Sequence, residues 1–229
     1  MSNLRNEHDH KGLRMPTSHK KVNALPRFLT LLFLVVFALP LLAADGKKLF
    51  ASCVACHGAR GEGNAQLGAP NIAGMASWYV SRQLANFASG SRGSDNADRY
   101  STQMREAAKV LISDDQRLAV SQHIASLPPQ PVASSAKVSD TDVANGRSQF
   151  NAICSSCHGS AARGNPTLSA PSLVGLDATY AERQLKAFRE GRRGAHPDDK
   201  WGAQMRVGAT MLADMRSGRD ALAYIATLK

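Results

Sequence analysis

The sequence is poor in aromatic residues and has no run that alternates apolar and polar residues over the length of a strand. Phe, Trp and Tyr make up 6% of the 229 residues, whereas hydrophobic residues make up 43%. Because a half-buried strand requires such alternation, the pattern argues against a β-sheet and predicts an all-α fold. A core with so few aromatic side chains needs another source of large apolar surface.

The sequence also lacks any stripe of lysine and arginine interleaved with aromatic residues, which a nucleic-acid-binding protein would show. The formal net charge is +10, but six of the 28 basic residues precede Asp45. The basic composition therefore does not indicate a nucleic-acid partner, and we expect none.

No apolar run reaches the roughly 20 residues that a membrane-spanning helix needs. The longest run, residues 28–42, follows a basic leader and precedes Ala43, Ala44 and Asp45. We interpret residues 1–44 as an export signal cleaved after Ala44. The alternative is an uncleaved anchor that holds the protein at the membrane. Either reading places the body of the protein outside the cytoplasm, and we expect it in the periplasm.

Cysteine is scarce as well, and all four cysteines lie in two copies of one motif, C-x-x-C-H. The copies consist of Cys53, Cys56 and His57, and of Cys154, Cys157 and His158. This motif attaches c-type haem: the two thiols form thioethers with the haem vinyl groups, and the histidine is the proximal iron ligand. Two covalent haem c groups are predicted, and they would supply the missing apolar surface. The alternative of one zinc ion or disulfides does not explain the histidine after each cysteine pair.

The chain is an internal duplication. Displaced by 101 residues, the second half aligns with the first without gaps from the first motif onward, so that Arg82-Gln83-Leu84 meets Arg183-Gln184-Leu185. Upstream, Gly46 and Phe50 match Gly146 and Phe150 at 100 residues, which indicates a one-residue insertion before the second motif. Such a repeat predicts one domain present twice: domain one over residues 45–129, a Pro/Ser linker over 130–137 and domain two over 138–229.

Each half has a helical pattern. A short helix is expected over residues 45–55, a long loop over 58–74, and a helix over 77–88 with Val80, Leu84 and Phe87 facing inward. Ser113 to Gln116 forms a capping box. It opens a last helix whose apolar side is predicted to carry Leu118, Ile124 and Leu127, with Leu222, Ile225 and Leu228 in the second half.

The sixth iron ligand decides whether a haem carries electrons or performs chemistry. Among the methionines after the leader, only Met104 and Met205 match each other in the repeat, each 47 residues after its histidine. We therefore predict His57/Met104 and His158/Met205 as the axial pairs. The alternative is that both methionines only fill the core. His123 and His196 match no histidine, and we interpret them as packing or surface residues.

On these motifs the chain resembles class I cytochromes c, specifically the dihaem cytochrome c4 family, over nearly all of its mature length. The resemblance implies two tandem helical cytochrome domains. It also implies that the carbonyls of Pro70 and Pro171 accept from the proximal histidines. The resemblance places four polar residues near the haem propionates and the domain interface: Arg82, Arg183, Tyr79 and Tyr180. It also implies that Tyr100 and Trp201 lie near the haem.

The resemblance further implies an electron carrier, not an enzyme, in the periplasmic respiratory chain. The expected donor is a quinol–cytochrome c reductase and the expected acceptor a haem–copper oxidase. Membrane association is expected only through these partners or an uncleaved leader. Two alternatives stay open: a cytochrome subunit of a flavocytochrome-type dehydrogenase, and a dihaem enzyme that acts as a peroxidase or oxidises thiosulfate.

Overall fold

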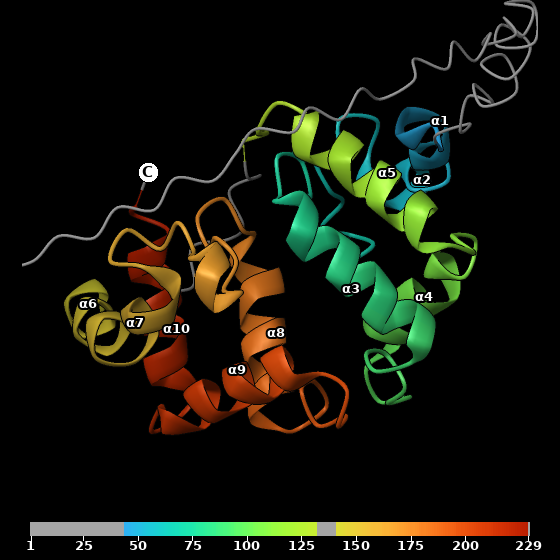
Figure 1. Cartoon of the computed structure of the whole chain (residues 1–229). Helices are drawn as coiled ribbons and strands as arrows, with labels where there is room; N and C mark the ends of the chain where they lie inside the picture. The colour runs from blue at the N-terminus through green and yellow to red at the C-terminus, as the bar shows by residue number, and fades with distance from the viewer. Residues whose placement is uncertain (1–43, 132–140, 229) are drawn as a thin grey trace, which may run out of the picture. The chain divides into compact units, whose positions relative to one another are not determined.

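The computed structural model describes residues 44–131 and 141–228, and Figure 1 shows their arrangement. The expected leader and most of the expected linker lie outside these residues. The described residues belong to one compact unit that begins at Leu42. They contain no β-strand, only two isolated bridges between Asn64 and Ala69 and between Asn165 and Ala170. The predicted all-α class is confirmed.

Residues 44–131, called the first domain below, contain five helices. They are α1 (Gly46–Phe50), α2 (Val54–His57), α3 (Ser77–Ser89), α4 (Arg99–Ala108) and α5 (Asp114–Ser126). The predicted last helix is present: the Ser113 hydroxyl accepts from the Gln116 N–H at 3.2 Å and caps α5. The Gln116 side chain accepts from the Ile112 N–H at 2.8 Å instead of from Ser113, so the capping box is only half formed.

Residues 141–228, the second domain, repeat this order. Their elements are α6 (Val143–Gln149), the π-helix η1 (Phe150–Cys154), α7 (Ser155–His158), the 3₁₀ helix η2 (Pro166–Leu168), α8 (Ala178–Arg189), α9 (Lys200–Met211) and α10 (Met215–Ile225). None of the helices in the described part of the chain is long and apolar enough to cross a membrane.

The predicted core positions are buried or partly buried, with one exception. Val80, Leu84, Phe87 and Ile124 join one core cluster in the first domain. Leu118, predicted on the apolar side of its helix, is 46% exposed. The prediction fails there because α5 packs along α1 and α3, and Val120 and Ile124 already fill the side that faces them.

The π-helix η1 accommodates the one-residue insertion inferred from the repeat. In the first domain Phe50 is three residues before Cys53, and the Cys53 N–H donates to the Phe50 carbonyl at 2.8 Å. In the second domain Phe150 is four residues before Cys154, and this segment winds as a π-helix. A π-turn holds one residue more than an α-turn. Both phenylalanines are buried nevertheless, at 3% and 0% exposure.

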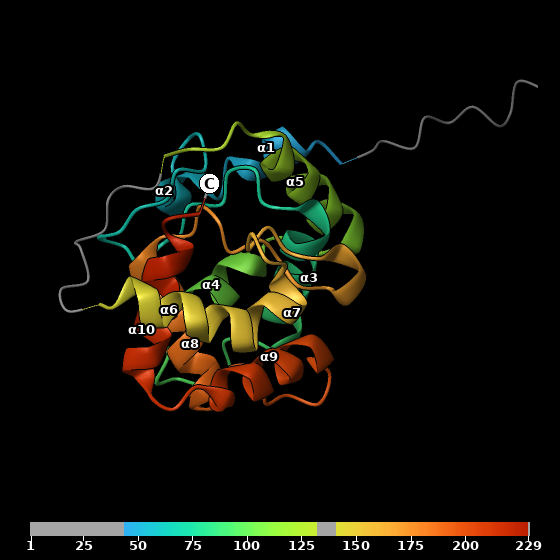
Figure 2. The ribbon, with the colours of Figure 1, turned by 90° about the vertical axis from the view of Figure 1, so that its left-hand side faces the viewer.

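In each domain the first helix packs closely against the last. Helix α1 packs on α5 and α6 packs on α10, and Figures 1 and 2 show both pairs. A Cβ atom at Gly46 would lie inside contact distance of the Ala119 carbonyl oxygen, and one at Gly146 would do the same at Asp220. Only glycine therefore allows the two backbones to approach this closely.

We expect Gly46→Ala to destabilise the protein by about 1–3 kcal/mol, because the added methyl group pushes α1 away from α5. Denaturant unfolding followed by far-UV circular dichroism would measure this loss. Lys47→Ala, on the exposed side of the same helix, is the control and should change stability by less than about 0.5 kcal/mol. Equal stability of Gly46→Ala and the control would contradict the close packing.

Candidate functional site

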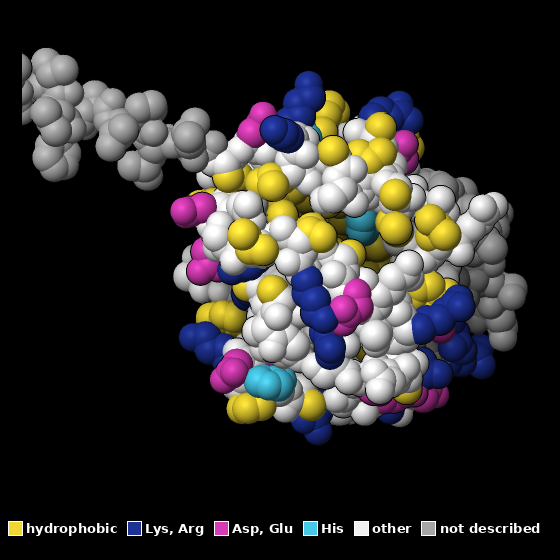
Figure 3. All heavy atoms as spheres, turned by 90° about the vertical axis from the view of Figure 1, so that its right-hand side faces the viewer, with side chains coloured by type: hydrophobic (Ala, Val, Ile, Leu, Met, Phe, Trp, Pro, Cys, Tyr) yellow, Lys and Arg dark blue, Asp and Glu magenta, His cyan; other side chains and the backbone are white. Residues whose placement is uncertain are grey.

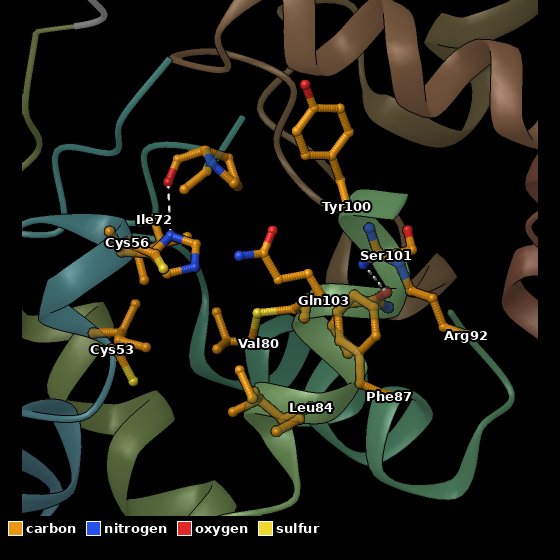
Figure 4. Close-up of a pocket in the computed structure, with 18 of the residues that line it drawn as sticks. Cys53, Cys56, Ile72, Val80, Leu84, Phe87, Arg92, Tyr100, Ser101 and Gln103 are labelled. Carbon is orange, nitrogen blue, oxygen red and sulfur yellow. Dashed lines mark hydrogen bonds between the residues drawn. The ribbon is translucent and has the colours of Figure 1, made fainter. Parts of the chain in front are cut away.

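Two cavities lie beside the two C-x-x-C-H motifs. The first has a volume of about 170 Å³ and the second about 680 Å³. Figure 4 shows the first cavity, with Cys53 and Cys56 on one side and Gln103, Phe87 and Arg92 on the other. Helix α3 contributes apolar lining residues, among them Val80 and Leu84. Each motif thus opens onto a space with mainly apolar walls, which is what a haem ring requires.

The first cavity opens at the molecular surface beside hydrophobic side chains. Leu67 is 45% exposed and Val110 57% exposed, and both line the cavity. Figure 3 shows hydrophobic side chains around a hollow in one face of the molecule, with a histidine visible inside. A planar group held in the first cavity would therefore have an edge close to solvent.

Helical geometry explains the spacing of each motif. In the first motif Cys53 is the N-cap residue of α2, and Cys56 and His57 follow three and four residues later. Residues at these spacings lie on one face of a helix. The motif therefore brings two thiols and an imidazole to one wall of the cavity. Cys154, Cys157 and His158 are arranged in the same way around α7.

A backbone carbonyl orients each motif histidine. His57 Nδ1 lies 2.9 Å from the Pro70 carbonyl oxygen, and His158 Nδ1 lies 2.8 Å from that of Pro171. Because a carbonyl only accepts, Nδ1 must carry the proton, and Nε2 keeps its lone pair for another partner. Burial lowers the pKa of both histidines despite this hydrogen bond, so both rings are neutral at pH 7, the form that binds a metal.

None of the motif cysteines pairs in a disulfide within the described residues, so all four are available for thioether bonds to haem. Burial raises the pKa of Cys53, and burial followed by the nearby Cys157 raises the pKa of Cys154 to about 11. At neutral pH these two thiols are protonated, which limits their oxidation and metal binding, since the thiolate is the reactive form. No group of three metal-ligating side chains that could hold a zinc ion occurs within residues 44–131 and 141–228.

The two predicted methionine ligands line the two cavities. Met104 lies on α4 and lines the first cavity, and Met205 lies on α9 and lines the second. Both are half-buried against the cores of their domains. Met75 lines both cavities as well, but its partner in the repeat is Leu176.

The cavity walls contain buried arginines, whose positive charges test whether the residues present fit haem. Arg92 and Arg193 are 5% and 7% exposed, and neither forms an ion pair with a carboxylate in the part of the chain that the structure describes. Both donate to Gln83 Oε1 and Gln184 Oε1, at 2.8 Å each. Burial lowers the pKa of Arg92. At Arg193 burial acts in the same direction, but Tyr79, Tyr180 and the more distant carboxylate of Asp199 together outweigh it and raise the pKa. Both side chains stay charged at pH 7.

Buried charge without an opposite charge is strongly unfavourable. The buried Nε–H groups of four arginines have no hydrogen-bond partner: Arg82, Arg92, Arg183 and Arg193. Haem carries two propionates, so two haems would bring four carboxylates to four cationic side chains. The residues present therefore fit haem in both cavities.

The sequence predicts only part of this wall. Arg82 and Arg183 were predicted near the propionates, with Tyr79 and Tyr180, and all four line a cavity. So do Tyr100 in the first and Trp201 in the second. Gln83, Gln184, Arg92 and Arg193 were missed as site residues. Their signal was present, because each matches an identical residue in the repeat.

Comparison with known families agrees with this geometry. The family model for cytochrome c matches twice, over residues 43–128 and 143–229. The chain belongs to the cytochrome c family. It carries two tandem cytochrome c domains and two covalently bound haem c groups, attached at Cys53 and Cys56 and at Cys154 and Cys157.

Two relatives narrow the family to dihaem proteins like cytochrome c4. Cytochrome c4 of Pseudomonas aeruginosa is 31% identical over 168 residues, which is 69% of this chain and 76% of the relative. The thiosulfate dehydrogenase electron acceptor of Stutzerimonas stutzeri is 31% identical over 179 residues, 70% of this chain and 77% of the relative. The predicted resemblance to cytochrome c4 is confirmed.

A solved structure shares the fold. The thiosulfate dehydrogenase of Marichromatium purpuratum is 28% identical, with a TM-score of 0.61. The match covers 80% of this chain but 40% of that protein. Together these matches show that this chain is a dihaem c-type cytochrome that carries electrons.

We expect the double substitution Cys53→Ala/Cys56→Ala to reduce the haem content from two to one per chain. The second motif, with its own core clusters around Phe150 and Leu185, should still load haem. Pyridine haemochrome spectra and the mass of the intact chain would measure the content. Ser52→Ala, next to the motif, is the control and should keep both haems. Complete loss of haem in the cysteine variant would show that the domains do not load independently.

Proposed function

We propose that His57 and Met104 are the axial ligands of the first haem, and His158 and Met205 those of the second. When bound, each haem supplies an iron that gains and loses one electron. The fixed Nδ1–H bond of each histidine to its proline carbonyl supports this assignment, because it leaves Nε2 available inside the cavity. The methionines line the same cavities from α4 and α9.

With these ligands the protein works as an electron carrier and not as a catalyst. A thioether favours the ferrous state and so raises the potential. Two protein ligands leave no vacant position at which oxygen or peroxide could bind. The exposed hydrophobic rim at the first cavity, Leu67 and Val110, gives a redox partner a surface close to the haem edge.

We expect Met104→Ala and Met205→Ala each to make one of the two haems bind carbon monoxide. Each should also halve the charge-transfer band of the iron–methionine bond, because the sixth position becomes vacant in one domain. Visible spectra with and without carbon monoxide would measure both effects. Met211→Ala, an exposed methionine of the second domain, is the control and should leave the spectrum unchanged. An unchanged spectrum in either ligand variant would rule out that methionine.

We further propose that this carrier operates in the periplasm and accepts electrons from a thiosulfate-oxidising dehydrogenase. The similarity to a protein named as the electron acceptor of such an enzyme supports this donor. Oxidative coupling of two thiosulfate anions releases two electrons, and two one-electron haems can store both. The proposed acceptor is a haem–copper oxidase, and the rival donor is a quinol–cytochrome c reductase.

Reduction kinetics would test the donor and the carrier role together. We expect thiosulfate alone to leave the oxidised protein unchanged, and thiosulfate with a catalytic amount of a thiosulfate dehydrogenase to reduce both haems. A quinol with quinol–cytochrome c reductase should reduce them more slowly. Faster reduction by the quinol pathway would favour the rival donor. Reduction by thiosulfate alone would show that the protein is itself an enzyme.

A further inference from the structure

Each haem cavity contains an arginine from the opposite domain. Arg183 belongs to the second domain but lines the first cavity, and Arg82 belongs to the first domain but lines the second cavity. Each also has an arginine of its own domain, Arg92 in the first cavity and Arg193 in the second. Each domain therefore contributes one arginine side chain to the cavity of the other domain.

Backbone hydrogen bonds hold the exchanged arginines. Arg183 Nη2 donates to the Gly68 carbonyl at 2.7 Å, and Arg82 Nη2 donates to the Ser169 carbonyl at 3.0 Å. Gly68 and Ser169 are equivalent in the repeat, so the two contacts are reciprocal. Each acceptor residue lines the cavity that receives the arginine.

The backbone at both acceptors has the same unusual conformation. Gly68 has φ of 67°, and Ser169 has φ of 55° although it carries a side chain. At Gly68 the Tyr100 ring occupies the space that a Cβ atom would need. Left-handed backbone is unfavourable for a residue such as serine. At Ser169 the left-handed residue ends η2, and the same turn presents its carbonyl to Arg82.

Aromatic rings hold the same two guanidinium groups. Arg183 lies 4.1 Å from the Tyr100 ring centre and 5.4 Å from that of Tyr180. Arg82 lies 5.1 Å from the Trp78 ring and 5.6 Å from the Tyr79 ring. These distances are in the range of cation–π attraction. Both arginines keep a buried Nε–H without a partner, so each has a donor left for a haem carboxylate.

We propose that each haem potential is raised by an arginine of the other domain: Arg183 acts on the first haem and Arg82 on the second. This inference rests on the haem sites proposed above. Ferric haem carries one positive charge more than ferrous haem, so a nearby cation favours the ferrous state. The two arginines are positioning and tuning residues, and neither is an iron ligand. Each haem reaches its full potential only while the two domains are docked.

Replacing Arg183 by glutamine should lower the potential of the first haem, and Arg82→Gln should lower that of the second. The ferrous-to-ferric ratio at a fixed potential should fall roughly tenfold, which corresponds to about 59 mV for a one-electron couple. The experiment is a redox titration of the full-length dihaem protein followed by NMR. The haem methyl signals are assigned to each domain through contacts with residues beside its motif.

Two further variants separate tuning from structural damage. Lys186→Gln removes a positive charge from the exposed side of the same helix as Arg183 and should shift both haems little. Arg183→Lys keeps the charge and should restore most of the first haem potential. A shift confined to the haem of the mutated residue's own domain, or equal shifts of both haems, would overturn the proposal. So would unchanged potentials in both glutamine variants.

The titration does not depend on the proposed partners or on the methionine ligands. A haem without a methionine ligand would lack the strongly shifted methionine methyl signal in its ferrous NMR spectrum, yet its response to the distant arginine could still be measured. Failure of the function proposed above and failure of the arginine exchange therefore give different results.

Discussion

The interaction on which the rest of the structure depends is the pairing of buried arginines with negative charge, since no ion pair reaches Arg92 or Arg193 within the described residues. Arg92 lines the first haem cavity and Arg193 the second. Both donate to neutral oxygens of Gln83 and Gln184, and each also donates to a tyrosine hydroxyl. Neutral acceptors satisfy N–H groups but do not cancel the charge. An ion left unpaired in such a place costs several kcal/mol. The haem groups are therefore structural members of this fold as well as its redox centres.

The same dependence explains the composition of the cores. A cavity lies beside the core of each domain, lined in part by the side chains of the core clusters. Outside these cavities the helices pack through small residues, and Gly46 and Gly146 allow the first and last helices of each domain to approach closely. A fold with so few aromatic side chains can be built because a large planar ring is attached covalently. The chain has only to enclose that ring.

The attachment sites and the duplication could be predicted from the sequence because covalent chemistry fixes the spacing of each motif. Helix α3 was predictable because Val80, Leu84 and Phe87 repeat at helical spacing. Helix α4 was not, since it buries only Ser101 and Ala108 and thus shows no apolar stripe. The cavity that receives Arg82 could not be predicted either, because an internal repeat does not reveal how its two copies dock. The axial ligands remain predictions.

The π-helix η1 locates the part of the domain whose length is free to change. The two domains differ by one residue between the buried phenylalanine and the first cysteine, and a wider turn absorbs the difference. From the motif to the methionine they have identical length, 47 residues. An added residue there would displace one wall of the cavity from the other. After the duplication, a change of length was therefore tolerated before the haem-binding motif, where a helix can change its winding. Any attempt to graft a new segment into this scaffold should begin at the same turn.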